Sequence, residues 1–178
     1  VVTGVQTCAL PIYFGQSWKT HPFTQFLSIG ISDIAVFPGN PDVLYAATGD
    51  VNYYYGSGNY SIGVIKSTDG GGSWEITSLN KSMSHQHLVS RLLVHPDNED
   101  MVIAAARDGI FKTTDGGDNW YSVSSSFFAR DMEFNPGNPE VMYVSTYNRN
   151  GNISILKSTD LGENWSIVKS FSNANRIV

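Results

Sequence analysis

The chain has 178 residues, of which 41% are hydrophobic and 15% are charged, and its net charge at pH 7 is −5. This composition is typical of a folded domain and excludes a disordered chain. The acidic balance argues against nucleic acid or an anionic membrane as a partner, and no apolar run approaches the roughly 18 residues of a membrane span.

The first twelve residues are unusual. Residues 2–12, VTGVQTCALPI, match codon by codon the translation of a common short-read sequencing adapter. We therefore expect residues 1–12 to be a sequencing artefact that packs poorly or not at all. The only cysteine of the chain, Cys8, lies in this stretch, so disulfides and cysteine–metal sites are not predicted.

A nine-residue motif then occurs three times at nearly even spacing. It reads KSTDGGGSW at 66–74, KTTDGGDNW at 112–120 and KSTDLGENW at 157–165. A repeat of about 45 residues is the signature of a solenoid or a propeller. The shorter match GQSW at 15–18 indicates that residues 13–30 are the remnant of an earlier repeat.

The sequence between the motifs repeats as well. Residues 33–48, 91–106 and 131–146 each show a short strand that ends at a proline-containing turn, followed by a more apolar strand. A third strand leads into each motif and a fourth follows its tryptophan. The predicted fold is therefore all-β, a partial β-propeller of about three four-stranded antiparallel blades with an incomplete ring. The predicted blades are 31–79, 88–125 and 129–170, with residues 171–178 beginning a further blade.

The motif Ser/Thr-x-Asp-x-Gly-x-x-Trp resembles the Asp box, or BNR repeat, which joins the third and fourth strands of a blade. Its aspartates would accept hydrogen bonds from the turn, its glycines would permit unusual backbone angles, and its tryptophans would be buried. We therefore interpret the box residues as structural rather than catalytic. They are Ser67, Asp69, Gly71, Trp74, Thr113, Asp115, Gly117, Trp120, Ser158, Asp160, Gly162 and Trp165.

The blade sequences resemble the sortilin-like and xyloglucanase-like (glycoside hydrolase family 74-like) propellers of exported bacterial proteins. This resemblance implies a secreted or cell-surface protein, in which further blades of the same polypeptide would be partners of these three. In such propellers the working loops lie at the end opposite the Asp boxes, where they join strand 2 to strand 3 and strand 4 to the next blade.

The loop at 49–60 is the longest of these and contains Asp50, Tyr53, Tyr54, Tyr55 and Tyr60. Tyrosines spaced by glycine and asparagine suit sugar stacking or a protein interface, although they could also pack on a neighbouring blade. The other candidate binding residues on this face are His85, His87, Arg107, Arg130, Tyr147 and Arg149, and Arg91 is placed there as well. A lone His-x-His pair without a third ligand favours a polar loop, so no metal or cofactor is predicted.

The predicted function is a binding module for a polysaccharide or a protein. The first alternative is part of a xyloglucanase-type glycoside hydrolase, for which Asp50 and Asp108 are the candidate carboxylates. The second is a structural or adhesive module of a surface protein. Because glycoside hydrolysis needs two carboxyl groups that flank the bond, we expect the chain alone not to be an enzyme.

Overall fold

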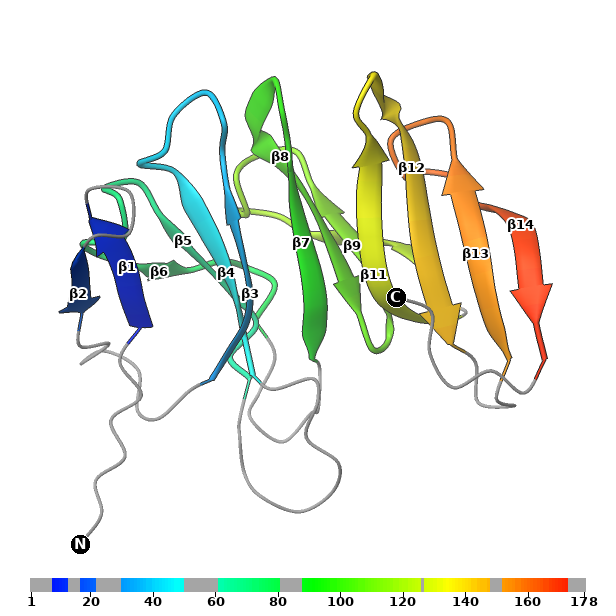
Figure 1. The fold of residues 1–178 in the computed structure, drawn as a ribbon, viewed down its shortest axis with the longest axis horizontal. Helices are drawn as coiled ribbons and strands as arrows, with labels where there is room; N and C mark the ends of the chain where they lie inside the picture. The colour runs from blue at the N-terminus through cyan, green and yellow to red at the C-terminus, as the bar shows by residue number, and fades with distance from the viewer. Residues whose placement is uncertain are drawn as a thin grey trace, which may run out of the picture.

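A computed structural model describes residues 8–12, 17–21, 30–49, 61–80, 88–125, 127–147 and 152–172. Within these residues every regular element is a β-strand (Figure 1). The described part of the chain accordingly includes no membrane-spanning helix.

Three antiparallel sheets of four strands follow one another along the chain, and we call them blades 1, 2 and 3. Blade 1 consists of β3 (Ile31–Val36), β4 (Leu44–Thr48), β5 (Val64–Ser67) and β6 (Glu75–Ile76). Blade 2 consists of β7 (Val89–His95), β8 (Asn98–Ala106), β9 (Gly109–Thr113) and β10 (Tyr121–Ser124). Blade 3 consists of β11 (Phe128–Asn135), β12 (Asn138–Tyr147), β13 (Ile153–Ser158) and β14 (Ser166–Phe171). The blades stand side by side in a row that does not close, which confirms the predicted partial propeller (Figure 1).

A separate two-stranded sheet precedes blade 1. Its strands are β1 (Cys8–Ile12) and β2 (Ser17–His21), which pair from Cys8 opposite His21 to Ile12 opposite Ser17. Residues 8–12 form a regular strand along their whole length, and the prediction that residues 1–12 pack poorly stays a prediction.

The second strand of blade 2, β8, is highly apolar because both of its faces are covered. Val102, Ala104 and Ala106 lie in the core shared with blade 1. Ile103 and Ala105 lie in the core shared with blade 3. Successive side chains of a strand point to opposite faces of its sheet, so one continuous apolar run serves two neighbouring cores. The stability of the row therefore comes from sheet-to-sheet packing between blades.

The first strands of neighbouring blades are joined by polar side chains. Ser32 Oγ donates a hydrogen bond to the Val89 carbonyl at 2.6 Å, and Ser90 Oγ donates to the Ala129 carbonyl at 2.9 Å. Each serine lies at an irregularity in its strand, where the register with the second strand shifts. The bulged serine of one blade thus bonds the backbone of the next.

Arg91 on β7 connects all three blades. Its guanidinium lies 3.8 Å from Asp33 of blade 1 and 3.5 Å from Asp131 of blade 3, and it also binds Glu133. The sequence placed Arg91 among the arginines of the loop face, and this was wrong. Because position 91 lies within a first strand, its side chain is used to bridge neighbouring first strands rather than to meet a ligand.

Candidate functional site

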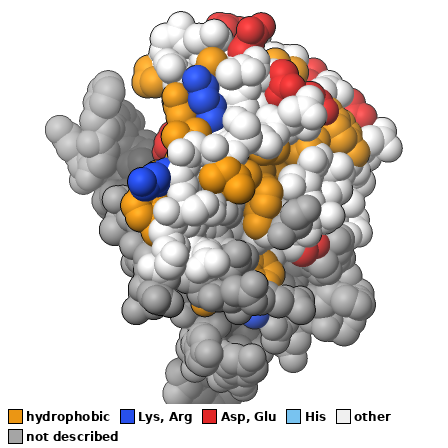
Figure 2. Space-filling view, turned by 90° about the vertical axis from the view of Figure 1, so that its right-hand side faces the viewer, with side chains coloured by type: hydrophobic (Ala, Val, Ile, Leu, Met, Phe, Trp, Pro, Cys, Tyr) orange, Lys and Arg blue, Asp and Glu red, His pale blue; other side chains and the backbone are white. Residues whose placement is uncertain are grey.

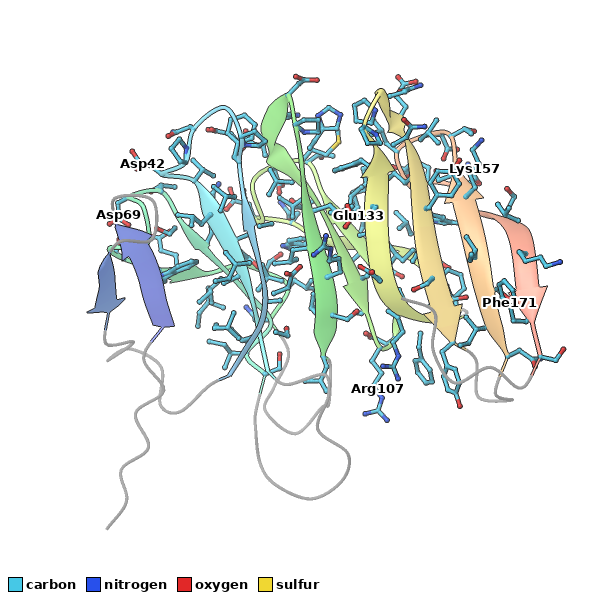
Figure 3. All side chains as sticks on the ribbon, viewed as in Figure 1. Asp42, Asp69, Arg107, Glu133, Lys157 and Phe171 are labelled. Atoms are coloured by element: carbon cyan, nitrogen blue, oxygen red, sulfur yellow. The ribbon has the colours of Figure 1, made fainter. Side chains whose placement is uncertain are left out.

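The two ends of the blades differ in chemistry. The Asp-box turns and the turns between first and second strands lie at one end, which we call the Asp-box end. The connections between second and third strands lie at the other, which we call the loop end. Figure 3 shows Asp42 and Asp69 at the Asp-box end and Arg107 at the loop end.

At the Asp-box end, the carboxylate of Asp69 is used within its own turn. Its Oδ1 accepts hydrogen bonds from the Ser73 amide and the Ser67 hydroxyl, both at 2.8 Å. Its Oδ2 accepts one from the Ser73 hydroxyl at 2.7 Å. Ser67 Oγ also accepts from the Gly71 amide at 2.9 Å, so the first and third box residues close the turn together.

The other two boxes repeat this arrangement. The amides of Asn119 and Asn164 donate to Asp115 and Asp160, both at 2.9 Å. Their side-chain amides donate to the second carboxylate oxygen at 2.8 and 2.7 Å. Hydrogen bonds of this kind favour the charged form, and those from the residue four positions later contribute most. They lower the pKa of all three box aspartates to about 2.

The box glycines are required by the turn. Gly71, Gly117 and Gly162 have φ values of 86°, 99° and 83°, in the left-handed region that side chains other than glycine rarely adopt. At Gly117 an added Cβ would also lie 2.8 Å from the Thr77 side chain of blade 1.

The box tryptophans pack in hydrophobic cores, but to different extents. Trp74 is buried, whereas Trp120 and Trp165 are half-buried against the cores shared with the preceding blade. The second and third Asp boxes are therefore held by their own turns and by the preceding blade. All three box carboxylates accept hydrogen bonds within their own turns.

At the loop end, Arg107 from the β8–β9 turn lies over an aromatic ring of blade 3. Its guanidinium carbon is 5.9 Å from the centroid of the Phe128 ring, a cation–π distance. The Arg107 amide donates to the Leu88 carbonyl at 3.0 Å, which fixes the backbone of this turn. Arg107 is exposed, and so is Arg130, two residues after Phe128.

Phe128 begins a row of large side chains across blade 3. It pairs directly with Tyr147, Tyr147 pairs with Ile153, and Ile153 pairs with Phe171. Directly opposite residues of an antiparallel sheet share a face and contact each other. Tyr147 and Phe128 are half-buried and Phe171 is exposed, so aromatic surface remains accessible at this edge.

Sequence reasoning singled out Arg107 and Tyr147 but missed Phe128 and Phe171. The predicted blade at 129–170 leaves out both phenylalanines, whereas they are the first residue of β11 and the last residue of β14. Aligning the strand ends of blade 3 with one another would have brought the three aromatic residues into register.

Asp108, a candidate carboxylate, is half-buried in the same β8–β9 turn as Arg107. With Ser61, Phe111 and apolar side chains, it lines a cavity of about 10 Å³ between blades 1 and 2, enough for a single water molecule. Among the described residues, Asp108 is the one carboxylate that lines this cavity. The described residues also assemble no cluster of three or more acidic, histidine or cysteine side chains suited to a metal ion.

Eight of the predicted site residues lie outside the described residues, and their roles stay predictions. They are Asp50, Tyr53, Tyr54, Tyr55, Tyr60, His85, His87 and Arg149.

Comparison with known proteins places this architecture in a family. Residues 63–176 match the family model described as Sortilin-Vps10, with the words sortilin and neurotensin receptor 3. The chain belongs to the Sortilin-Vps10 family. The match covers two complete blades and the Asp box of the first, and it confirms the sortilin-like resemblance of the repeats. No curated protein sequence matches the chain significantly.

Solved structures share the fold at low sequence identity. The glycoside hydrolase family 74 enzyme of Niastella koreensis is 21% identical over 79% of this chain and 22% of its own, with a TM-score of 0.58. The family 74 xyloglucanase of Xanthomonas campestris is 22% identical over 78% of this chain and 23% of its own, with a TM-score of 0.56. A chain of a nidogen/laminin complex is 15% identical over 93% of this chain and 60% of its own, with a TM-score of 0.61. The Sortilin-Vps10 chain thus spans about a fifth of the length of either enzyme.

Proposed function

We propose that the chain is part of an exported Asp-box propeller whose loop end binds a polysaccharide. The observation that carries this proposal is the placement of Arg107 over Phe128 at the loop end. Aromatic faces stack on apolar faces of other rings, and a guanidinium supplies several hydrogen-bond donors beside them. The Asp-box end offers no comparable surface, because its carboxylates bond their own turns.

The loop end is also where the sequence predicts the tyrosine-rich loop at 49–60. A second set of aromatic side chains at this end would extend the surface that begins at Phe128, and the expected ligand is therefore long rather than a single sugar. Secretion or display at the cell surface accompanies this proposal, since polysaccharides of this size are met outside the cell.

Affinity electrophoresis on soluble polysaccharides, including xyloglucan, tests the proposal. The chain should migrate more slowly in at least one polysaccharide gel, and Phe128→Ala should weaken the retardation about five- to tenfold, as expected for a central contact residue. Arg107→Ala should weaken it similarly, while Arg107→Lys, which keeps the charge but not the planar donor group, should weaken it less.

Ile76→Ala is the matched control, because Ile76 is an exposed apolar residue of blade 1 near the Asp-box end. It should leave migration unchanged, and circular dichroism should show all variants folded. Binding that survives both Phe128→Ala and Arg107→Ala would place the ligand elsewhere. Absence of retardation in every polysaccharide, together with binding to a protein, would favour the protein-binding alternative, for which the nidogen/laminin complex gives a precedent at the level of fold.

A second candidate function is part of a glycoside hydrolase. The position of Asp108 at the loop end, against the cavity between blades 1 and 2, is the observation that favours it. One carboxyl group is insufficient for either hydrolytic mechanism, and Asp50 is the candidate for the second. If this candidate is right, the natural polypeptide should release reducing sugar from xyloglucan and lose that activity in Asp108→Asn, whereas the 178-residue chain alone should release none.

A further inference from the structure

Charge is divided unevenly between the two ends of the blades. The turns at the Asp-box end carry exposed carboxylates in every blade, and these include Asp42, Asp69, Asp97, Asp115, Asp118 and Asp160. Figure 2, in which the Asp-box end is at the top, shows acidic side chains gathered there. Among the described residues of the loop-end turns, Asp108 is the one carboxylate, and it is half-buried. The net charge of −5 therefore does not exclude an anionic ligand at the loop end.

The lysines near the Asp-box end are used in contacts between blades. The side chain of Lys112 is only 5% exposed, and its ammonium donates to Glu163 Oε1 of blade 3 at 2.6 Å. The Lys66 ammonium lies 3.8 Å from Asp100 of blade 2, and a Cβ added to Gly116 would collide with it. Both lysines thus reach the Asp-box turn of the following blade. Positive charge for a ligand has to come from other residues.

The loop end presents Arg107 as an exposed cation in a fixed place. Its guanidinium carbon lies 5.9 Å from the centroid of the Phe128 ring, and its amide donates to the Leu88 carbonyl at 3.0 Å. A guanidinium that lies over an aromatic ring keeps the N–H groups in its own plane, and these can bind a carboxylate in pairs. Arg107 is therefore positioned to bind an acidic group beside an aromatic surface.

Arg130 is a second exposed cation, at a position where the other two blades have serine. Ser32, Ser90 and Arg130 are each the extra residue at the irregularity in the first strand of their blade. The two serines are half-buried and donate hydrogen bonds to the backbone of the following blade. Arg130 is exposed and lies two residues after Phe128. Blade 3 thus has a cation where its neighbours have a packing residue.

The carboxylate that follows Arg130 in the chain has other partners. Asp131 lies 3.5 Å from Arg91, and its Oδ1 accepts a hydrogen bond from the Met132 amide at 2.9 Å. Within the part of the chain that the structure describes, Arg130 itself forms no ion pair. The charge of Arg130 is therefore available to a ligand.

We propose that the polysaccharide bound at the loop end is acidic, and that Arg107 and Arg130 bind the carboxylates of its uronic acid residues. This inference rests on the proposed function and adds the chemical class of the ligand. A sugar ring stacked on the aromatic surface at Phe128 would carry its carboxylate at the ring edge, beside the guanidinium groups. A planar carboxylate accepts two parallel hydrogen bonds from one guanidinium, so we assign the acidic group as a carboxylate rather than a sulfate.

Calorimetric titration of the 178-residue chain with polygalacturonate and with methyl-esterified polygalacturonate tests the proposal, because the two polymers share a backbone and differ in charge. The acid should bind about tenfold or more tightly than the ester at low salt, and the difference should shrink as salt rises. Arg130→Ser, which gives this bulge the residue of the other two blades, should remove much of the difference. Phe128→Ala should weaken the binding of both polymers alike.

Lys157→Met is the matched control. The Lys157 ammonium also lies over an aromatic ring of blade 3, 5.8 Å from the Tyr143 centroid, but it is at the end opposite Arg107 (Figure 3). Removing this charge should leave the affinity ratio of the two polymers unchanged. Dextran sulfate, compared with dextran, tests the other source of negative charge and should show a smaller gain than the acid shows over its ester.

Equal affinity for the acid and the ester would overturn this inference and leave the proposed function intact. Absence of binding to every polysaccharide would overturn both. A preference for the acid that survives Arg130→Ser combined with Arg107→Gln would also overturn it, because the cation would then lie elsewhere. An equal gain with dextran sulfate would overturn the assignment of the acidic group as a carboxylate.

Discussion

Replacing Lys112 by methionine should destabilise the fold measurably, whereas the same change at Lys66 should not. Methionine keeps most of the length and packing of the lysine stem and removes only the ammonium. At position 112 the change removes hydrogen bonds to the Leu161 carbonyl and to Glu163. At position 66 it removes a 3.8 Å ion pair with Asp100.

The expected magnitudes follow from burial. A hydrogen bond that involves a charged group contributes about 1.5–3 kcal/mol, and a buried carbonyl left without a partner costs about 1–3 kcal/mol. Glu163 is 45% exposed and can regain water, so these contributions do not add in full. We expect about 2 kcal/mol for Lys112→Met. Lys66 and Asp100 are 25% and 53% exposed, and a pair of this kind contributes about 0–1 kcal/mol.

Urea unfolding followed by tryptophan fluorescence measures both variants without screening the charges. With a slope of about 2 kcal/mol per molar urea, Lys112→Met should lower the midpoint by about 1 M and Lys66→Met by a few tenths at most. Adding Glu163→Gln to Lys112→Met should cost little more, because the partner is already lost. Equal midpoint shifts for the two lysine variants would refute the burial argument.

Three further predictions concern the box residues and the open face. Trp120→Ala should cost about 3 kcal/mol in the same urea experiment, at the lower end for large aromatics because Trp120 is half-buried; less than about 1 kcal/mol would contradict its packing between blades. The box aspartates have a folded pKa of about 2, below the unfolded value, so their contribution is complete above about pH 4 and is lost as the pH falls towards 2. Asp115→Asn should flatten this acid dependence without abolishing it, and an unchanged pH profile would argue against the linkage. The 178-residue chain should self-associate through the face that exposes Tyr143, and light scattering should show less association for Tyr143→Asp, whereas a monodisperse unmutated chain would contradict this.

The architecture was predictable because the sequence repeat occurs three times, and each copy predicts the same four-stranded blade. The Asp-box spacing, the proline turns and the apolar second strands each indicate the same four-stranded unit, and the observed sheets agree. These features depend on local chemistry. A turn with a left-handed backbone needs a glycine, and a strand buried on both faces needs consecutive apolar residues, so both are visible in a short stretch of sequence.

Contacts between blades were not predictable in this way. Arg91 looked like a loop-face arginine, but its position within β7 sets it among the carboxylates of two other blades. Phe128 and Phe171 are 43 positions apart, at the two ends of blade 3, and only the strand register brings them into one row. Such contacts depend on twist and register between elements, which no short stretch of sequence encodes.

The lysine contacts also give the row of blades a direction, and this bears on how such proteins evolve. Lys66 of blade 1 and Lys112 of blade 2 each reach the Asp-box turn of the following blade, so both observed joints are head-to-tail. A gene duplication that copies one whole repeat in place therefore creates a new joint that is already complementary. An inverted or partial copy would set lysine against lysine or leave a turn without its ammonium. We expect lineages of this propeller to have gained or lost blades in whole repeats of about 45 residues, with few compensating substitutions at the neighbouring joints.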